Sequence, residues 1–466
     1  MDIRHFILSP GFSLRGWKRL PYAIQSVSRP VTFFFSENEW ELLTLCDGHT
    51  PMDWEKLTVT ERDRLIKWEK AGFIVPCRGN ESLAAKQEYR FYPARFKEKV
   101  QWSITGRCNF KCRHCFMSAP HALHGEPSFG QLMTMLDAFE RCGIKCVELT
   151  GGEPLIHPDL WRITDEILRR GMVIPTIYTN GLLVSDDFLD GLESRNIRPA
   201  IQVSFDGVGH HDWMRGVYGA EKAVTDALIR CRERCFPTFA SMVLCRENVG
   251  SIRETVNRLA ELGCLGVKIC GASPQGEWLS QREHYLTQPQ IFAAFLDYLP
   301  HYFEDGLPLS IGLEGFFSYD KFSGTISAFS ERNVPENRFG RSLLCADARR
   351  EMYVSPRGKV LPCMLMAGGA AEEMFPNMLE TPLEEILDSG SFYMETTDLR
   401  VSDFMAHNPN CQSCGFRSQC CGGCRAVALR ESPGDFLAID PVTCQYFKDG
   451  WHERKIALLR DILGLK

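Results

Sequence analysis

The chain has 466 residues, of which 44% are apolar and 24% charged, a composition typical of a globular protein with material for a sizeable core. Its net charge of −6 and pI near 6.1 provide no strong basic field for nucleic acid or an acidic membrane. The sequence also lacks a long apolar stretch and the apolar core of a signal peptide. We therefore expect a cytoplasmic protein with neither nucleic-acid nor membrane partners.

Residues 1–95 form the first of three expected domains. Thr32–Phe35 is typical of a strand, and Ser36 can cap a helix that follows it. A capping box predicts that a second helix begins after Thr58, and the short apolar run Phe73–Val75 comes next. This order of elements favours a small winged-helix-like module.

Residues 96–325 form the second expected domain and alternate between strand-like and helical patterns. Repeated β-then-α units predict an α/β fold with a parallel sheet, and six units favour an open, partial (β/α)6 barrel. In barrels of this kind the chemistry lies at the carboxyl ends of the strands. The expected strands are 100–105, 146–150, 174–179, 200–205, 239–244 and 266–270. The expected helices lie near 129–142, 158–171, 186–194, 219–234, 250–263 and 288–304.

Residues 326–466 form the third expected domain, in which the regular pattern fades and cysteines accumulate. A helical stretch near 446–464 closes the chain. The whole chain has 20 cysteines, a high number for a cytosolic protein. In a reducing compartment, clustered cysteines are more often metal ligands than disulfide partners.

The first cysteine cluster follows the first expected barrel strand as a C-x3-C-x2-C motif, made by Cys108, Cys112 and Cys115. Thiolates are soft ligands that select iron–sulfur clusters or zinc. With three local thiolates, a four-iron cluster keeps one iron open to another ligand. The alternative is a zinc site, for which His114 is a poorly spaced fourth ligand.

A second motif follows the next expected strand, where Gly151, Gly152, Glu153 and Pro154 read GGEP. The two glycines let the backbone approach a ligand closely, and the Glu153 carboxylate can accept a hydrogen bond from an ammonium group. A Gly-Gly turn alone is common. The GGEP motif is a more specific signal here, because it stands at the end of the next expected strand after the cysteine motif.

Together the two motifs resemble the radical S-adenosylmethionine (SAM) superfamily. The resemblance implies a [4Fe-4S] cluster on the three cysteines, whose open iron binds SAM and cleaves it reductively to methionine and a 5′-deoxyadenosyl radical. Ser204 and Arg215 resemble superfamily residues near SAM, although a turn residue and a surface arginine are the alternatives. The implied SAM-binding residues are Gly151, Gly152, Glu153, Ser204 and Arg215.

Seven cysteines follow an ordered pattern in the third domain: Cys345, Cys363, Cys411, Cys414, Cys420, Cys424 and Cys444. This pattern resembles the SPASM extension of radical SAM enzymes that modify peptides and proteins, and a zinc ribbon is the alternative. The resemblance implies two auxiliary [4Fe-4S] clusters, three clusters in all. The first auxiliary cluster would be bound by Cys345, Cys363 and Cys424. The second would be bound by Cys411, Cys414, Cys420 and Cys444.

Some relatives have a further cysteine soon after the first, but none occurs between Cys345 and Cys363. The first auxiliary cluster therefore has an iron open to a substrate thiolate, unless Cys421 serves locally. Two other pairs at i, i+4 spacing are expected to be buried, inert thiols: Cys142 with Cys146, and Cys231 with Cys235.

The resemblance favours a maturase that modifies a ribosomally made precursor peptide, with the first domain binding its leader through a strand edge. A thioether cross-link is the leading product, and carbon–carbon cross-linking or epimerisation are alternatives. The resemblance also implies a flavodoxin or ferredoxin as the reductant. The sequence assigns no catalytic base.

Three other functions compete with this interpretation. Sulfatase-maturing relatives carry an Asp base at the position that is Met364 here. Radical SAM tailoring of a small molecule such as a tetrapyrrole leaves the first domain without a peptide ligand. A non-catalytic iron–sulfur protein does not explain the GGEP motif.

Overall fold

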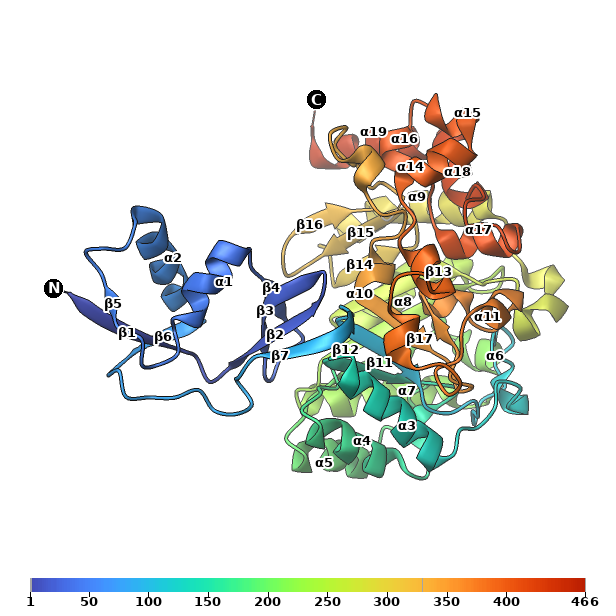
Figure 1. Cartoon of the computed structure of the whole chain (residues 1–466). Helices are drawn as coiled ribbons and strands as arrows, with labels where there is room; N and C mark the ends of the chain where they lie inside the picture. The colour runs from blue at the N-terminus through green and yellow to red at the C-terminus, as the bar shows by residue number, and fades with distance from the viewer. Residues whose placement is uncertain (1, 329, 466) are drawn as a thin grey trace.

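The computed structural model describes residues 2–328 and 330–465 and shows an N-terminal module beside a larger body that holds the barrel and the cysteine-rich region (Figure 1). Within the described ranges, no helix has the length and apolar character needed to cross a bilayer.

The N-terminal module contains two small sheets and two helices. Its elements are β1 (Ile3–Leu8), β2 (Phe12–Lys18), β3 (Leu20–Ser26), β4 (Thr32–Phe34), α1 (Glu37–Thr44), β5 (Met52–Asp53), α2 (Val59–Lys70), β6 (Ile74–Cys77) and β7 (Arg90–Arg95). The sheet orders are β5-β1-β6 and β4-β3-β2-β7. Both helices begin after the predicted caps, Ser36 and Thr58, and each has a capping box. The sequence analysis missed β1 to β3. In β2 a register shift between Arg15 and Trp17 breaks the alternation that marks a strand.

The module is attached to the larger body through β2 and β3. Trp17 is fully buried, and its Nε1 donates to the Cys142 carbonyl oxygen at 3.0 Å. Lys145 Nζ donates to the Val27 carbonyl oxygen at 2.7 Å. These contacts seat the module on the turn between a helix and a strand of the barrel.

The barrel alternates strands and helices as predicted. Its elements are β8 (Lys99–Ser103), η1 (Ala119–His121), α3 (Phe129–Arg141), β9 (Cys146–Thr150), η2 (Pro154–Ile156), α4 (Leu160–Arg169), β10 (Thr176–Thr179), α5 (Asp186–Ser194), β11 (Ala200–Ser204), α6 (His211–Arg215), α7 (Ala220–Glu233), β12 (Thr238–Leu244), η3 (Val249–Ser251), α8 (Ile252–Glu261), β13 (Gly266–Gly271), η4 (Gly276–Ser280), η5 (Arg282–His284), α9 (Gln288–Glu304), β14 (Ser310–Leu313), β15 (Phe317–Asp320) and β16 (Thr325–Ser327). The α/β fold with a partial barrel is confirmed.

The sheet extends beyond the six predicted strands, in the order β16-β15-β14-β13-β12-β11-β10-β9-β8-β17-β18. Strands β8 to β14 are parallel neighbours in chain order. The short strand β14 was missed, and β17 comes from the cysteine-rich region to pair in parallel with β8. Local patterning cannot reveal β17, because its partner lies about 250 residues earlier in the chain.

The strand faces divide the barrel into an apolar exterior and a polar interior. On β8, Val100 and Trp102 are fully buried. The Trp102 ring packs edge-on against the ring of Phe139 on α3, with 5.4 Å between the ring centroids. Lys99 and Gln101 alternate with them and therefore point to the opposite face. The helices thus cover apolar side chains, while the interior carries polar groups.

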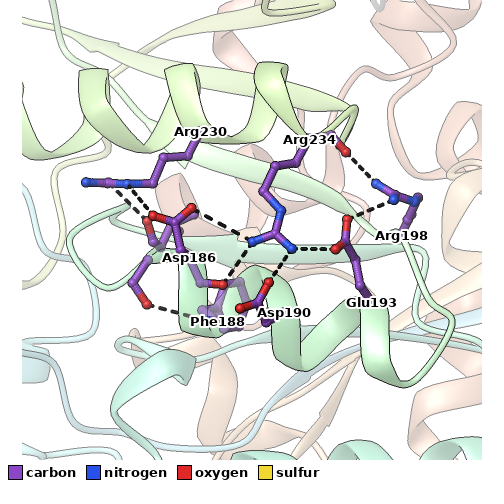
Figure 2. A network of polar contacts seen from close by, with 9 residues as sticks. Asp186, Phe188, Asp190, Glu193, Arg198, Arg230 and Arg234 are labelled. Carbon is purple, nitrogen blue, oxygen red and sulfur yellow. Dashed lines mark hydrogen bonds and ion pairs between the residues drawn. The ribbon is translucent and has the colours of Figure 1, made fainter.

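On the exterior, α5 and α7 are joined by a network of ion pairs (Figure 2). Arg234, which caps the end of α7, contacts three carboxylates that all lie on α5: Asp186, Asp190 and Glu193. Arg198 also contacts Glu193, at 2.8 Å. The carboxylates are partly exposed, so we expect this network to fasten two helices without adding much stability.

The cysteine-rich region contains short elements around the barrel edge. They are η6 (Phe339–Arg341), α10 (Asp347–Arg350), β17 (Glu351–Val354), β18 (Val360–Leu361), η7 (Met364–Met366), α11 (Ala370–Met374), α12 (Leu383–Ile386), α13 (Phe392–Thr397), α14 (Val401–His407), α15 (Pro409–Gln412), α16 (Arg417–Cys420), α17 (Arg425–Glu431), α18 (Pro441–Lys448) and α19 (Trp451–Leu463). The single closing helix predicted near 446–464 is two helices, because Gly450 adopts a φ of 74° between them.

Candidate iron–sulfur and SAM site

The loop after β8 carries the C-x3-C-x2-C motif, with all three cysteines partly buried. Backbone N–H groups donate to Cys108 Sγ at 3.4 Å and to Cys115 Sγ at 3.3 Å. The side chain of Arg215 donates from Nη1 to Cys112 Sγ at 3.7 Å. Each sulfur therefore accepts a hydrogen bond, which suits a thiolate that binds iron.

The protonation of these thiols also fits a metal-binding role. Burial raises the pKa of Cys108 to about 12 and also raises the pKa values of Cys112 and Cys115. Thiols with raised pKa values are poor free nucleophiles. A coordinated metal ion overcomes the raised pKa, because a thiol bound to the metal is deprotonated outright.

The donor geometry does not support a zinc site. In residues 2–328 and 330–465, no three His, Cys, Asp or Glu side chains are placed to hold one metal ion. His114 is not part of such a set among these residues. Its Nδ1 is buried without a hydrogen-bond partner, and burial lowers its pKa to about 4. A four-iron cluster distributes its thiolates over separate irons, so its cysteines need not converge on one point.

The two glycines of the GGEP motif lie directly against the cysteine loop. A Cβ on Gly151 would lie 2.6 Å from the Thr105 carbonyl oxygen, and one on Gly152 would lie 2.1 Å from the Arg107 carbonyl oxygen. The Gly152 N–H donates to the Thr105 carbonyl oxygen at 2.9 Å. The close approach that the structure shows is to the backbone of the cysteine loop, and approach to a ligand stays a prediction.

The Glu153 carboxylate is fully buried and joins the ends of β9 and β10. Its Oε1 accepts from Thr179 Oγ1 at 2.8 Å and its Oε2 from the Asn180 N–H at 2.7 Å. Burial raises the pKa of Glu153 to about 7, and these donors oppose the rise. Both oxygens already have protein donors, and contact of Glu153 with SAM stays a prediction.

Arg215 is not a surface arginine. It is buried, and its Nε donates to Asp206 Oδ2 at 2.6 Å while its Nη1 faces Cys112. Asp206 is fully buried and also accepts from the Val243 N–H at 3.0 Å. Burial favours the neutral form of Asp206, but the charge of Arg215 outweighs it and holds the pKa of Asp206 well below its usual range. The arginine thus connects a buried carboxylate to a predicted cluster ligand.

Two further strand ends complete this face of the barrel. Ser204, the other predicted SAM contact, ends β11 and is partly buried. Asn180 follows β10, and its Nδ2 donates to Asn109 Oδ1 at 2.7 Å and lies 3.9 Å from Cys108 Sγ. In the sequence, Thr179-Asn180-Gly181 resembles a superfamily segment near SAM, and an ordinary Asn-Gly turn is the alternative.

The seven C-terminal cysteines gather in two places. After burial, the neighbouring Cys424 and Cys345 thiols raise the pKa of Cys363. Elsewhere, after burial, Cys444 and Cys414 raise the pKa of Cys411. Burial also raises the pKa of Cys420, with smaller contributions from Asp440, Cys421 and Cys444. The two sets that lie together are Cys345, Cys363 and Cys424, and Cys411, Cys414, Cys420 and Cys444. These are the sets implied for the two auxiliary clusters, although the ligand assignment itself stays a prediction.

Cys421 lies beside the second of these sets, since Cys411 packs against the same apolar cluster. It is fully buried in an apolar cluster with Leu344 and Phe404, and its Sγ donates to the Ser418 carbonyl oxygen at 3.3 Å. It therefore does not serve as a fourth ligand beside Cys363 in this arrangement. The predicted inert thiols Cys142, Cys146 and Cys231 are buried. Cys235 is exposed instead, because it lies in the turn after α7 with a φ of 59°.

A polar cavity of about 210 Å³ connects the barrel interior to Cys363. Lys99 Nζ lies 3.3 Å from Glu148 and 3.0 Å from Glu351, and the Tyr178 hydroxyl donates to Glu148 at 3.2 Å. The lining residues are Lys99, Gln101, Glu148, Tyr178, Glu351, Met352, Tyr353, Cys363 and Met364. Sequence reasoning missed this site, although charged side chains in strands covered by helices were the available signal.

Comparisons with known proteins agree with these observations. A profile described as the radical SAM superfamily matches residues 102–259, and one described as an iron–sulfur cluster-binding domain, SPASM, matches residues 345–415. An AdoMet-dependent heme synthase of Methanosarcina barkeri is 23% identical over 73% of this chain and 95% of its own length. A PqqA peptide cyclase of Gluconobacter oxydans is 27% identical over 73% of this chain and 88% of its own.

Among solved structures, Streptococcus suis SuiB bound to the precursor peptide SuiA aligns with a TM-score of 0.65 and 16% identity. The alignment covers 94% of this chain and all of that one. At this identity the likeness concerns the fold, and it includes the N-terminal module as well as the barrel.

Proposed function

We propose that this chain, which belongs to the radical SAM superfamily and carries a SPASM domain, is a maturase that forms a thioether cross-link in a ribosomally made precursor peptide. The observation that carries this proposal is the polar cavity, which brings the barrel interior to Cys363 in a set of three cysteines. A three-cysteine set leaves a cluster position for a further ligand, and a substrate thiolate is the ligand that a thioether reaction needs.

The cofactors of the proposal are SAM and three [4Fe-4S] clusters. Cys108, Cys112 and Cys115 would hold the first, and the two C-terminal sets would hold the others. When bound, SAM and the first cluster supply a 5′-deoxyadenosyl radical that abstracts hydrogen from a substrate carbon. Gly151, Gly152, Glu153, Ser204 and Arg215 are proposed to bind SAM. A flavodoxin or ferredoxin would supply the electron.

A peptide substrate agrees with two of the relatives, a PqqA peptide cyclase and the SuiB structure with its precursor peptide. The N-terminal module offers a place for the leader. Strand β4 ends its sheet in the order β4-β3-β2-β7, so one backbone edge has no partner strand in the described residues. Phe33 and Phe34 on this strand are 37% and 41% exposed. An extended leader can pair with that edge and place side chains against the two rings.

The cavity residues have a defined task in this reaction. Glu148 and Glu351 are the carboxylates that can take the thiol proton, and Lys99 lies between them and holds their orientation. The Tyr178 hydroxyl fixes the far side of Glu148. Met364, at the position where sulfatase-maturing relatives carry a base, has no ionisable group, which disfavours formylglycine formation.

The atoms balance as the loss of two hydrogens from the peptide. One leaves as a hydrogen atom from carbon, and the thiol gives up a proton and one electron as the carbon–sulfur bond forms. The electron requires a one-electron acceptor, for which an auxiliary cluster is the available class of group.

The test is incubation of the reconstituted, reduced enzyme with SAM and a Cys-containing peptide encoded beside its gene, followed by the mass of the peptide. Loss of two hydrogens with one thiol blocked supports the thioether. Loss of two hydrogens with a free thiol indicates carbon–carbon cross-linking. A mass that is unchanged in ordinary water but gains deuterium in heavy water indicates epimerisation.

A second candidate is the tailoring of a tetrapyrrole, which the heme synthase relative favours. It predicts no binding of any peptide to the N-terminal module and conversion of a porphyrin carboxylate substrate in the same assay. Peptide binding measured by fluorescence anisotropy separates the two candidates.

A further inference from the structure

A second cavity, of about 610 Å³, lies on the inner face of β11 to β14 and of the hairpin β15–β16. Among the described residues it shares no lining residue with the polar cavity beside Cys363. Protein interiors are close-packed and leave few voids larger than a water molecule, whereas ligand pockets commonly have volumes of about 300 to 1,000 Å³. The size of this cavity therefore points to a ligand.

Gly312 leaves part of this space free. It lies on β14 between Ile311 and Leu313, which are buried in the core, so the alternation of the strand turns position 312 toward the barrel interior. A Cβ on Gly312 would meet no other atom of the described residues within 4 Å, and its backbone is not in the left-handed region. The fold therefore does not require glycine here, and the missing side chain widens the cavity.

The cavity borders the amino ends of the barrel strands. Phe239, Gly266 and Ser310 line it, and they stand at or next to the first residues of β12, β13 and β14. The cysteine loop and the GGEP motif follow the carboxyl ends of β8 and β9 instead. Because these strands are parallel, the cavity and the predicted SAM site lie toward opposite ends of the barrel interior.

The inner faces of two strands connect the cavity with the predicted SAM site. Gln202 lines the cavity, and Ser204, a predicted SAM contact, lies two residues further along β11. Side chains two residues apart on a strand point to the same face and are separated by about 7 Å along it. Lys268 and Cys270 are related in the same way on β13. A ligand in the cavity is therefore close to the site along both strands.

The N-terminal module is attached at the end of the barrel where the cavity lies. Lys145 directly precedes β9, and its Nζ donates to the carbonyl oxygens of Val27 in the module and of Gly171 in the turn after α4. Trp17 of the module donates to the Cys142 carbonyl oxygen, in the same turn as Lys145. Both turns lead into the amino ends of strands. A peptide held by the module thus meets the barrel at the end that carries the cavity.

The hairpin offers an extended peptide a backbone edge. β16 ends the sheet in the order β16-β15-β14, and its outer edge has no partner strand in the part of the chain that the structure describes. Thr325 and Ser327 of β16 line the cavity, together with Tyr319 and Phe322. Phe322 is 72% exposed, so the cavity opens to solvent at the hairpin turn. A strand added to this edge places alternate side chains toward the cavity.

We propose that this cavity binds the segment of the precursor peptide between its leader and its modified residues, extended against β16, with an apolar side chain in the space beside Gly312. The inference rests on the proposed function, because it requires a peptide substrate. A porphyrin, the substrate class of the second candidate, has no peptide backbone to pair with the β16 edge. The free edge therefore favours a peptide as the occupant.

The first experiment fills the free space and measures turnover of the Cys-containing peptide by the reconstituted full-length enzyme. Gly312→Phe should lower kcat/KM for the peptide by about tenfold or more, since a steric mismatch in an apolar pocket has effects of this size. Gly312→Ala should have a smaller effect. The iron content and the thermal unfolding midpoint of Gly312→Phe should match those of the unsubstituted chain.

The matched control is Gly130→Phe, which places the same ring on the exposed first turn of α3. A Cβ there lies 4.0 Å from its nearest neighbour, and the position is outside the cavity. We expect no change in kcat/KM. A folded Gly312→Phe enzyme that modifies the peptide as fast as Gly130→Phe would show that the proposal is wrong.

A second measurement leaves Gly312 intact and decides the question if Gly312→Phe does not fold. Phe322 is replaced by the photoreactive p-benzoylphenylalanine, the peptide is added, and the irradiated complex is digested for mass spectrometry. Cross-links should form with residues between the leader and the modified positions. Cross-links confined to the leader, or none with bound peptide, overturn the proposal.

The unsubstituted chain distinguishes a failure of this inference from a failure of the proposed function. If that chain neither binds nor modifies the peptide, the proposed function is wrong and this inference falls with it. If Gly312→Phe then blocks conversion of a porphyrin, the cavity belongs to a small molecule. A peptide that the unsubstituted chain and Gly312→Phe modify equally well overturns only the role of the cavity.

Discussion

The two cysteine regions of this chain are built in opposite ways. Cys108 and Cys115 lie seven residues apart on one loop, and the backbone of that loop donates to their sulfurs. The set that contains Cys345 and Cys424 draws ligands from segments nearly eighty residues apart and brings them together by packing around β17 and β18. When the cysteines lie on one loop, their spacing in the sequence largely sets their arrangement. When they come from distant segments, they meet only after the surrounding region has folded.

The largest expected effect comes from removing the local site. Cys108→Ala, Cys112→Ala and Cys115→Ala together should abolish deoxyadenosine formation, because no thiolates remain to hold the SAM-binding cluster. Iron in the C-terminal region should remain, since that region folds around its own cysteines. Liquid chromatography of the nucleoside products and an iron assay test both points. Surviving SAM cleavage would show that the site has been misassigned.

The dispersed site is tested by two neighbouring cysteines with different surroundings. Cys424→Ala should cost about four iron atoms per chain and stop peptide modification, while SAM cleavage continues. Cys421→Ala should retain all iron, because its Sγ contacts the Ser418 carbonyl oxygen inside an apolar cluster. Equal iron loss in both variants would place Cys421 among the ligands.

The third prediction compares a buried with an exposed arginine. Arg215→Met leaves the Asp206 carboxylate buried without its ion-pair partner and should cost about 3 to 5 kcal/mol of unfolding free energy. Arg234→Met removes the contacts that the Arg234 guanidinium makes in Figure 2 on the barrel exterior, and should change the denaturation midpoint only slightly.

Urea denaturation of the apoprotein measures both changes. Arg215→Met combined with Asp206→Asn should recover part of the loss, because the uncompensated charge is gone. A double variant no more stable than Arg215→Met would mean that the ion pair is not the source of the effect.

The smallest expected effect is a change in pH dependence. Glu153 has a pKa raised from its ordinary 4.5 to about 7, so between these values the folded chain binds more protons than the unfolded chain. Its contribution therefore makes stability fall as pH rises from about 4.5 to about 7, by at most about 1.4 kcal/mol per unit. Glu153→Gln should remove this slope, which denaturation at several pH values measures. An unaltered slope would show that Glu153 ionises normally.

Much of the barrel could be predicted from the sequence alone. Strands β8 to β13 and the main helices between them appear at the expected positions, because each has a local apolar pattern and some helices have clear caps, such as the one at Ser128 before α3. The cysteine loop and the GGEP glycines could also be located from the sequence, because each is a short motif that directly follows a predicted strand.

Other features were decided by tertiary structure. Pairing of β17 with β8, the contact of Arg215 with Cys112, and placement of Cys363 at the wall of a cavity all join residues far apart in the chain. Such contacts produce no repeating residue pattern in the sequence, since they depend on how the helices and strands pack against one another. The sequence by itself determined which chemistry the chain can support. Only the folded structure decided which buried groups, Arg215 and Asp206 among them, surround that chemistry.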